Sequence, residues 1–172
     1  VKGLRPLTKF YSFFQGVDVQ NYITPKLLEI QMISGKFQIG ETIESSPTFT
    51  TSKIRFRLCK PDHKFGPFDT PTEKFKYIPY NQQTPPTSYS ESSTFLNVDT
   101  NALQLPSEVE YYGLASVGMT LIGKSSKAVA KVTNIRLISD NIGRLLGSLY
   151  IPDPTVPSNP KWTNGENTFT II

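Results

Sequence analysis

Hydrophobic residues alternate with polar ones along much of this chain, a pattern typical of β-strands that bury one face. The alternation is clearest over residues 28–32, 54–58 and 144–151. Residues 10–14 are bulky and apolar on both faces, which predicts a central strand. The sequence Asp-Asn-Ile-Gly at 140–143 predicts a hairpin between residues 136–138 and 145–146, because Asn and Gly accept positive φ. The chain is therefore predicted to be all-β.

Helical signals are weak in comparison. The capping-box spacing of Ser107 and Glu110 precedes an apolar stretch. It predicts one short helical turn at most.

Two related segments occur in the chain, Ile39 to Ser46 and Val117 to Ser126. Each begins with an aliphatic residue, Gly, any residue, Thr and a second aliphatic residue, and each reaches a Ser-Ser pair. Both lead toward an Ile-Arg strand, at 54–58 in the first copy and 135–137 in the second. This repetition predicts a duplicated hairpin motif whose two halves interlock into a closed barrel without exposed edges.

Proline-rich stretches at 60–89 and 152–160 predict long loops, because proline removes hydrogen-bond donors and interrupts regular elements. The first loop has few aliphatic residues with which to build a core of its own. We therefore predict that its aromatic side chains bind a partner, although folding back over the barrel is an equal alternative. These residues are Phe65, Phe68, Phe75, Tyr77, Tyr80 and Tyr89.

Composition narrows the classes of function. The chain has 172 residues, 37% of them hydrophobic, and no apolar run close to the ~20 residues of a membrane span. Its net charge of +4 comes from scattered basic residues, which argues against a nucleic-acid partner. Cys59 is the one cysteine, so no internal disulfide can form.

Candidate chemical groups do not form a convincing set. His63 is the one histidine, which argues against a nucleophilic triad, and Cys59 with His63 supplies too few ligands for a structural zinc site. Carboxylate pairs such as Glu108 with Glu110, or Asp18 with Asp99, are expected to be solvated surface acids. We expect no catalytic residue, no cofactor and no metal site, and hence no enzyme.

One motif does suggest nucleotide binding. Residues 118–125 match the pattern G-x-x-x-x-G-K-S of phosphate-binding loops. A phosphate-binding loop opens a helix, whereas residues 127–132 alternate like a strand. The first copy of the repeat also lacks the Gly-Lys pair, so the motif is interpreted as a hairpin turn.

The two ends of the chain resemble large tail and baseplate proteins of tailed bacteriophages, notably the contractile-tailed phages of cyanobacteria. The likeness rests on the segment GLRPLTKFYSFFQGVDV at 3–19 with Tyr-Ile-Thr-Pro at 22–25, on GRLLGSLYIP at 143–152, on Pro-Lys-Trp at 160–162 and on GENTFTI at 165–171. It covers about a third of the chain and departs at Gln15, where the pattern usually has Asp. The duplicated Gly-x-Thr segments also resemble small barrel-like modules of the same virion proteins.

This resemblance implies a small β-sandwich made by the chain ends, residues 1–25 with 140–172, and an inserted barrel-like β-domain at 26–139. A single continuous sandwich is the alternative. The implied function is structural: a virion component of the tail baseplate or tail fibre, assembled in the host cytoplasm. Its partners would be other phage tail proteins or further domains of the same polypeptide, in a symmetric homo-oligomeric assembly. A carbohydrate-binding domain for host surface glycans is the alternative function. Because the chain begins at Val1 without a signal-peptide pattern, we expect a piece of a longer polypeptide.

Overall fold

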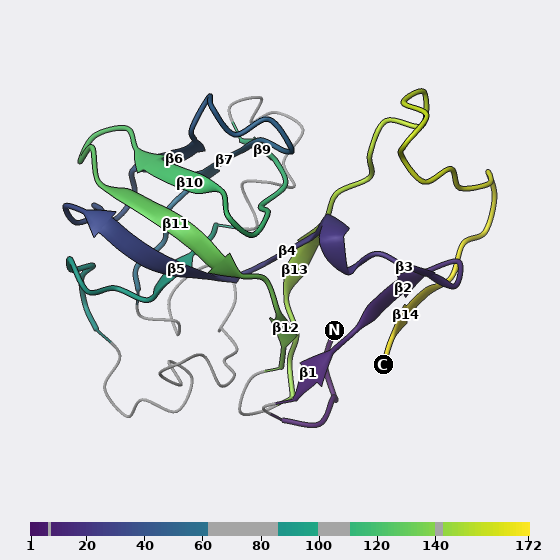
Figure 1. The fold of residues 1–172 in the computed structure, drawn as a ribbon. Helices are drawn as coiled ribbons and strands as arrows, with labels where there is room; N and C mark the ends of the chain where they lie inside the picture. Colours follow the sequence, from purple (N-terminus) through teal and green to yellow (C-terminus); the bar gives the residue numbers. More distant parts are fainter. Residues whose placement is uncertain (7, 62–85, 100–110, 140–142) are drawn as a thin grey trace.

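A computed structural model describes residues 1–6, 8–61, 86–99, 111–139 and 143–172, and Figure 1 shows its fold. The described residues are all-β apart from one short 3-10 helix, η1 (Gln20–Tyr22), so the predicted fold class is confirmed. Among them no helix is long and apolar enough to cross a membrane. The strands are β1 (Lys9–Phe10), β2 (Ser12–Phe14), β3 (Val17–Asp18), β4 (Ile23–Pro25), β5 (Leu27–Ser34), β6 (Thr42–Ser45), β7 (Ile54–Arg57), β8 (Phe95–Asn97), β9 (Tyr112–Gly113), β10 (Thr120–Gly123), β11 (Val129–Asn134), β12 (Leu137–Ile138), β13 (Gly147–Leu149) and β14 (Phe169–Ile171).

The largest sheet of the described chain has seven strands in the order β8-β5-β11-β10-β6-β7-β9, and every pairing is antiparallel. It curls until the segments that follow β7 and β8 meet. Leu58 pairs there with Val98, and the Cys59 N–H donates to the Asn97 carbonyl at 2.9 Å. We call this curled sheet the barrel sheet; it lies at the left of Figure 1.

The inside of the barrel sheet holds the main hydrophobic core. Alternation in β7 places Ile54 and Phe56 inward, with exposed fractions of 1% and 0%. Leu121 on β10 and Val132 on β11 belong to the same cluster of buried residues. The period-two patterns of the sequence therefore predict this core correctly.

The two copies of the repeat have matching backbone geometry. In the first, the Gly40 N–H donates to the Leu58 carbonyl at 2.8 Å and the Leu58 N–H donates to the Glu41 carbonyl at 2.9 Å. In the second, the Gly118 N–H donates to the Val132 carbonyl and the Val132 N–H donates to the Met119 carbonyl, both at 2.8 Å. Both glycines have positive φ, +82° and +87°, which explains why glycine occupies this position in each copy.

Strands β6 and β10 of the two copies pair directly, with the equivalent residues Glu44 and Ile122 opposite each other. A local two-fold relation therefore passes through this pair. One detail of the sequence prediction is wrong: the strand of the second copy that is equivalent to residues 54–58 is β11, because Val132 makes the same backbone hydrogen bonds as Leu58. The Ile-Arg sequence at 135–136 follows the end of β11.

The chain ends form a second group of strands, which we call the end unit: residues 1–25 and 137–172 in their described parts. Its strands make three short sheets, β1-β12, β13-β4 and β14-β2-β3. Phe13 pairs with Thr170 and Phe14 with Phe169, which confirms that residues 10–14 join strands of the C-terminal third. Both termini lie in this unit (Figure 1). The predicted sandwich is not confirmed by these three sheets.

The predicted hairpin around residues 140–143 is wrong, because β12 and β13 do not pair with each other. β12 pairs with β1 and β13 pairs with β4. The first residues of the chain lie beside residues 143–145 instead: the Leu4 N–H donates to the Gly143 carbonyl at 2.9 Å. The run 10–14 is also two strands, interrupted at Tyr11, and its β2 part is the central strand of its sheet.

Division of the chain into two domains stays a prediction. The end unit does have its own cluster of buried residues, which includes Leu137 from within the predicted insertion. The predicted helical turn at 107–110 and most of the proline-rich loop, residues 62–85, lie outside the described residues.

Candidate assembly interface

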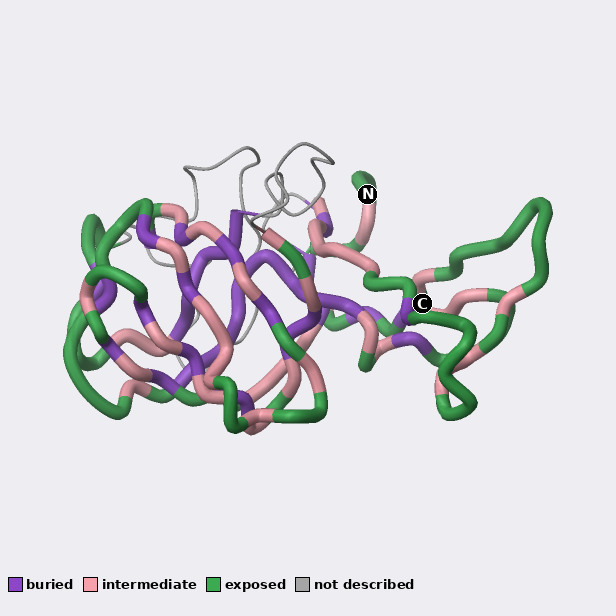
Figure 2. Tube along the Cα trace, turned by 90° about the horizontal axis from the view of Figure 1, so that it is seen from above, coloured by how far each residue is buried: buried purple, intermediate pink, exposed green. Residues whose placement is uncertain are grey.

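The core of the end unit is small and partly open. Five of its residues are buried, and the aromatic residues packed against them, such as Phe14 and Trp162, are themselves only partly buried. Figure 2 shows the contrast: buried segments concentrate in the barrel sheet, whereas the end unit is mostly intermediate or exposed. A unit that buries little apolar surface alone gains stability by docking against something else.

An apolar groove opens from this core to the surface, with a volume of about 210 Å³. The strands β13 and β14, together with the first residue of the chain, supply most of its walls. The lining residues are Val1, Ile23, Leu137, Leu145, Leu146, Gly147, Leu149, Phe169 and Ile171. None of them carries a polar side chain, so the groove suits an apolar occupant.

Strand β13 borders the groove with an unpaired edge. The Lys26 N–H donates to the Leu146 carbonyl and the Tyr150 N–H donates to the Tyr22 carbonyl, so the even-numbered residues of this run face the β4 side. In an antiparallel pair the intervening residues turn their backbone groups the other way. The N–H and C=O groups of Gly147 and Leu149 therefore point away from β4, and no strand of the described chain pairs with them there.

Val1 lies at the start of this edge. Its ammonium group donates to the Leu145 carbonyl at 3.0 Å, and the Leu145 N–H donates to the Val1 carbonyl at 2.9 Å. A hydrogen-bonded ladder thus runs beside β13 between Val1 and Leu145, and within the described residues nothing continues it past Gly147. Unpaired edges of this kind are templates for pairing with another strand.

Strand β14, which also lines the groove, has an unpaired edge as well. Tyr11 and Ile172 exchange backbone hydrogen bonds of 2.9 Å, and the Gln15 N–H donates to the Thr168 carbonyl. The backbone groups of Phe169 and Ile171 alternate with these and point away from β2. β14 is the outer strand of its sheet, and the Phe169 side chain is 41% exposed.

Further large apolar side chains are exposed near the chain ends. Val1 is 63% exposed, Ile151 65% and Ile172 68%. Exposed apolar residues that gather beside a groove mark interaction sites, whereas single scattered ones do not.

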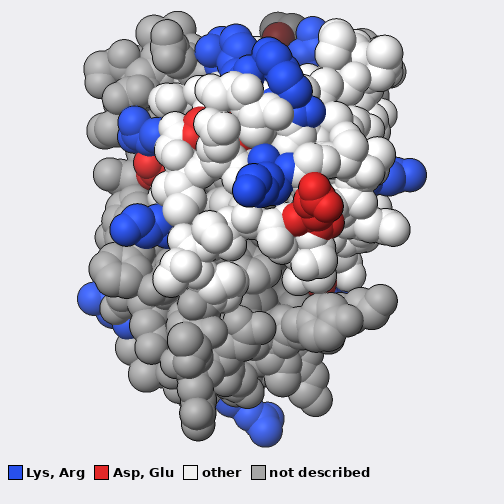
Figure 3. All heavy atoms as spheres, turned by 90° about the vertical axis from the view of Figure 1, so that its left-hand side faces the viewer, with Lys and Arg blue, Asp and Glu red and all other residues white. Residues whose placement is uncertain are grey.

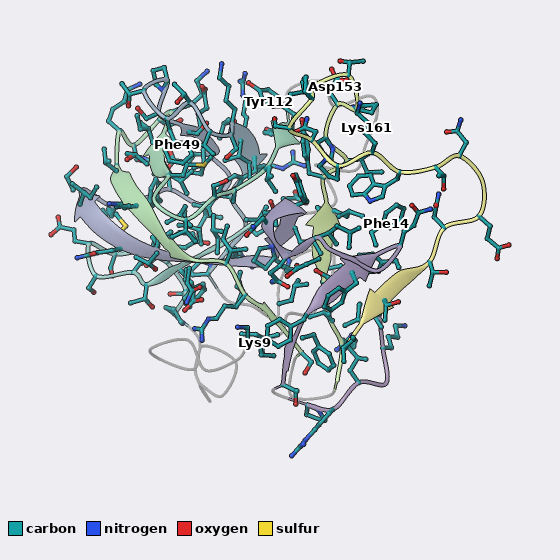
Figure 4. All side chains as sticks on the ribbon, turned by 45° about the vertical axis from the view of Figure 1, so that its right-hand side comes forward. Lys9, Phe14, Phe49, Tyr112, Asp153 and Lys161 are labelled. Carbon is teal, nitrogen blue, oxygen red and sulfur yellow. The ribbon has the colours of Figure 1, made fainter. Side chains whose placement is uncertain are left out.

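Aromatic rings pack against one another beside the core of the end unit. Trp162 meets Phe14 edge-to-face, with ring centroids 4.9 Å apart, and Tyr22 with centroids 6.4 Å apart. Phe14 projects from β2 on the side of the segment that carries Lys161 (Figure 4). Trp162 is itself partly buried and packs against the buried cluster of the end unit.

Gln15 lies in the turn between β2 and β3. It has a positive φ of +49° and is followed by Gly16 at +76°. Two-residue hairpin turns with positive φ favour Asn or Asp. The Gln15 side chain instead donates to Thr163 and Asn167, and so holds the C-terminal loop to the turn.

The Gly-Lys-Ser sequence is a hairpin turn, as predicted. It joins β10 to β11, which pair antiparallel, and no helix follows it. Its backbone amides are already bonded: the Ser125 and Ser126 N–H groups donate to Oε2 of Glu41 at 3.1 and 3.0 Å. In a phosphate-binding loop such amides would face the phosphate; here a carboxylate of the same chain takes that place.

Tyr89 is the one predicted partner-binding residue that the structure describes, and that prediction is corrected. Its side chain is 4% exposed and belongs to the barrel core. The Tyr89 hydroxyl donates to the Cys59 carbonyl at 2.7 Å and accepts the Asn97 N–H at 3.1 Å, and burial raises its pKa. The Tyr89 hydroxyl therefore has both a hydrogen-bond acceptor and a hydrogen-bond donor inside the barrel, and its buried side chain offers almost no surface to a partner. Phe65, Phe68, Phe75, Tyr77 and Tyr80 lie outside the described residues.

The other groups considered from sequence are engaged locally or not described. Asp99 accepts a hydrogen bond from Nε of Arg57 at 3.0 Å, and Asp18 accepts the Gln20 N–H at 2.8 Å. Burial raises the pKa of the Cys59 thiol, so that it stays protonated at neutral pH. In the described part of the chain no group of three or more His, Cys, Asp or Glu residues is placed to hold a metal ion.

Charge does not mark a site on the barrel face in Figure 3. In the part that the structure describes, the basic side chains are interrupted by uncharged and acidic surface. Lys124 is paired with Glu44 at 2.7 Å.

Sequence reasoning missed the groove and the β13 edge, because their residues come from both ends of the chain. Gly147 within the period-two run at 144–151 was the available signal, since glycine in a strand often marks a close backbone approach. Comparison with protein-family models, curated protein sequences and solved structures finds no match to this chain.

Proposed function

We propose that this chain is a structural component of a bacteriophage tail, in the baseplate or associated with a tail fibre, and that it works by protein–protein assembly. The observation that carries the proposal is the unfinished edge of the end unit. The backbone groups of Gly147 and Leu149 adjoin an apolar groove, and both features fit an extended segment, either of another virion polypeptide or of another part of the same parent polypeptide.

Addition of a strand at β13 would pair the free backbone edge and fill the apolar groove at the same time. The backbone of the incoming segment would continue the ladder that Val1 begins at Leu145. Alternate side chains of that segment would enter the groove, whose 210 Å³ exceeds the ~150 Å³ of a cavity that holds benzene. Full burial of one large apolar side chain contributes about 1.5–3 kcal/mol. A Cβ at Gly147 would lie within 3.3 Å of Leu137 and Ile23, two residues that line the groove, so glycine leaves this part of the groove unfilled.

The link to a phage tail rests on the resemblance of the chain ends. The segments that carry it, 3–19, 143–152 and 165–171, include β13 and β14, which line the groove, and β2, which pairs with β14. The duplicated barrel sheet would serve as a rigid spacer between contacts. Partners would be other tail proteins or further domains of the same polypeptide, within a symmetric assembly.

Amide hydrogen exchange tests the proposal directly. The free chain should exchange the outward amides of Gly147 and Leu149 quickly, because they have no acceptor among the described residues. In purified phage tails the peptide spanning 145–151 should become protected. Equal exchange of this peptide in the free chain and in tails would refute assembly through β13.

Paired proline variants give a second test. In Leu149→Pro the lost N–H points away from β4, so the chain should fold but fail to enter tails. In Ser148→Pro the lost N–H faces β4, so the β13-β4 sheet itself should fail. Normal incorporation of a folded Leu149→Pro chain would contradict the proposal. Binding of the free chain to host polysaccharide, with no incorporation into tails, would favour the carbohydrate-binding alternative instead.

A further inference from the structure

A second cleft, unrelated to the apolar groove, lies where the barrel sheet meets the end unit. Its volume is about 430 Å³, within the ~300–1,000 Å³ range of small-ligand sites. The end unit contributes η1 and Asn159, and the barrel side contributes the loops before β7 and before β10. We call it the junction cleft.

The polar side chains of the junction cleft are amides and hydroxyls. Gln20, Asn21 and Asn159 supply amides, and Thr51, Ser52 and Ser116 supply aliphatic hydroxyls. No Asp, Glu, Lys, Arg or His is among the described residues that line it. Phosphates and carboxylates are bound by cationic groups, and metal cations by carboxylates, so this lining does not suit a charged ligand.

Several of these groups are held in place. The hydroxyls of Ser52 and Ser116 are hydrogen-bonded to each other at 2.6 Å, across the two loops of the barrel side. Nδ2 of Asn159 donates to the Asp153 carbonyl at 2.8 Å, which fixes the amide while Oδ1 remains available as an acceptor. Fixed donors and acceptors lower the entropy that binding costs.

Apolar surface accompanies the polar groups. Leu114 is buried at the base of the cleft, and Val117 is 59% exposed beside it. Tyr22, whose ring also meets Trp162 edge-to-face, is a further lining residue. A sugar ring presents hydroxyls at its edge and C–H groups on its faces, and this combination matches both parts of the lining.

We propose that the junction cleft binds a neutral saccharide. The amides and hydroxyls would bond the sugar hydroxyls, and Val117 with Tyr22 would contact its C–H face. This site is independent of the β13 edge and of the assembly function proposed above.

The test is a titration of the whole chain, followed by ¹H–¹⁵N NMR, with the methyl glycosides of glucose, galactose and N-acetylglucosamine. At least one glycoside should cause saturable shifts at Asn21, Ser116, Val117 and Asn159 at millimolar concentrations. Inorganic phosphate should cause none there. Asn159→Ala should weaken binding about tenfold, the equivalent of one well-formed hydrogen bond.

The duplication offers a matched control. Ile39 occupies in the first copy the position that Val117 occupies in the second, and it does not line the cleft. Val117→Ala should weaken glycoside binding several-fold, whereas Ile39→Ala should leave it unchanged. No saturable shift with any of the three glycosides would overturn the proposal. Shifts confined to residues 62–85, or equal effects of the two alanine variants, would overturn it as well.

Discussion

Glu41 joins the two copies of the duplicated hairpin, and its removal gives the sharpest prediction about stability. The residue precedes β6 in the first copy and is 6% exposed. Its Oε1 accepts the Gln38 N–H at 2.6 Å and the Ser126 hydroxyl at 2.8 Å, and its Oε2 accepts the backbone amides of Ser125 and Ser126. The turn of the second copy is thus bonded to the first copy through one carboxylate.

Glu41→Ala should lower the free energy of unfolding by about 3 kcal/mol. Hydrogen bonds to a charged group contribute about 1.5–3 kcal/mol each, and a buried donor left without an acceptor costs about 1–3 kcal/mol. Three backbone amides lose their acceptor in this variant. Ser125 is exposed, so water can replace part of the loss, which keeps the estimate at the lower end.

Glu44→Ala is the matched control, because Glu44 lies on β6, the strand that directly follows Glu41, and pairs with the half-exposed Lys124. A surface ion pair contributes about 0–1 kcal/mol. Urea unfolding followed by circular dichroism should therefore separate the two variants by about 2 kcal/mol, and amide exchange should quicken at Ser125 and Ser126 only in Glu41→Ala. Equal stability of the two variants would refute the role of Glu41 as a link between the copies.

Three further predictions concern single residues. Lys124→Ala should change the free energy of unfolding by less than about 1 kcal/mol, because Lys124 is a half-exposed partner of Glu44, and it should not change nucleotide binding. The prediction would be contradicted if the wild type bound ATP with magnesium and the variant did not. Trp162→Phe should change the free energy of unfolding by only about 1 kcal/mol, measured by thermal unfolding, because the lost ring area is offset by removal of a buried Nε1–H that has no partner among the described residues. A loss above about 3 kcal/mol would contradict this, because it would mean that the Nε1–H is hydrogen-bonded in the folded chain. Cys59 should be alkylated by iodoacetamide more slowly at pH 8 than the same cysteine in urea, because its raised pKa lowers the thiolate fraction in the folded chain, and the difference should shrink as pH rises through that pKa; equal rates would contradict the burial.

Local patterns predicted much of the barrel sheet. Alternation found β5 and β7 because the side-chain period of a strand is visible in a few consecutive residues. Gly40 and Gly118 revealed the duplication because a backbone with positive φ restricts the residue type in each copy. Neither signal needs knowledge of distant partners.

Long-range features could not be read in this way. The hairpin expected at 140–143 failed because the first residues of the chain, which no local turn rule includes, lie beside Gly143 and Leu145. Tyr89 was assigned to a partner from the proline-rich composition around it, whereas its hydroxyl finds partners at Cys59 and Asn97 inside the barrel. The apolar groove was missed for the same reason, since its walls come from both chain ends.

Electron cryo-microscopy of the intact phage particle tests the central claim most directly. The account predicts density for the barrel sheet and the end unit in the tail, with an extended segment of another polypeptide, or of another domain of the parent chain, paired with β13 and one of its apolar side chains inside the groove. Density in which the outward edge of Gly147 and Leu149 faces solvent in every copy, or a particle that contains no copy of the chain, would contradict it.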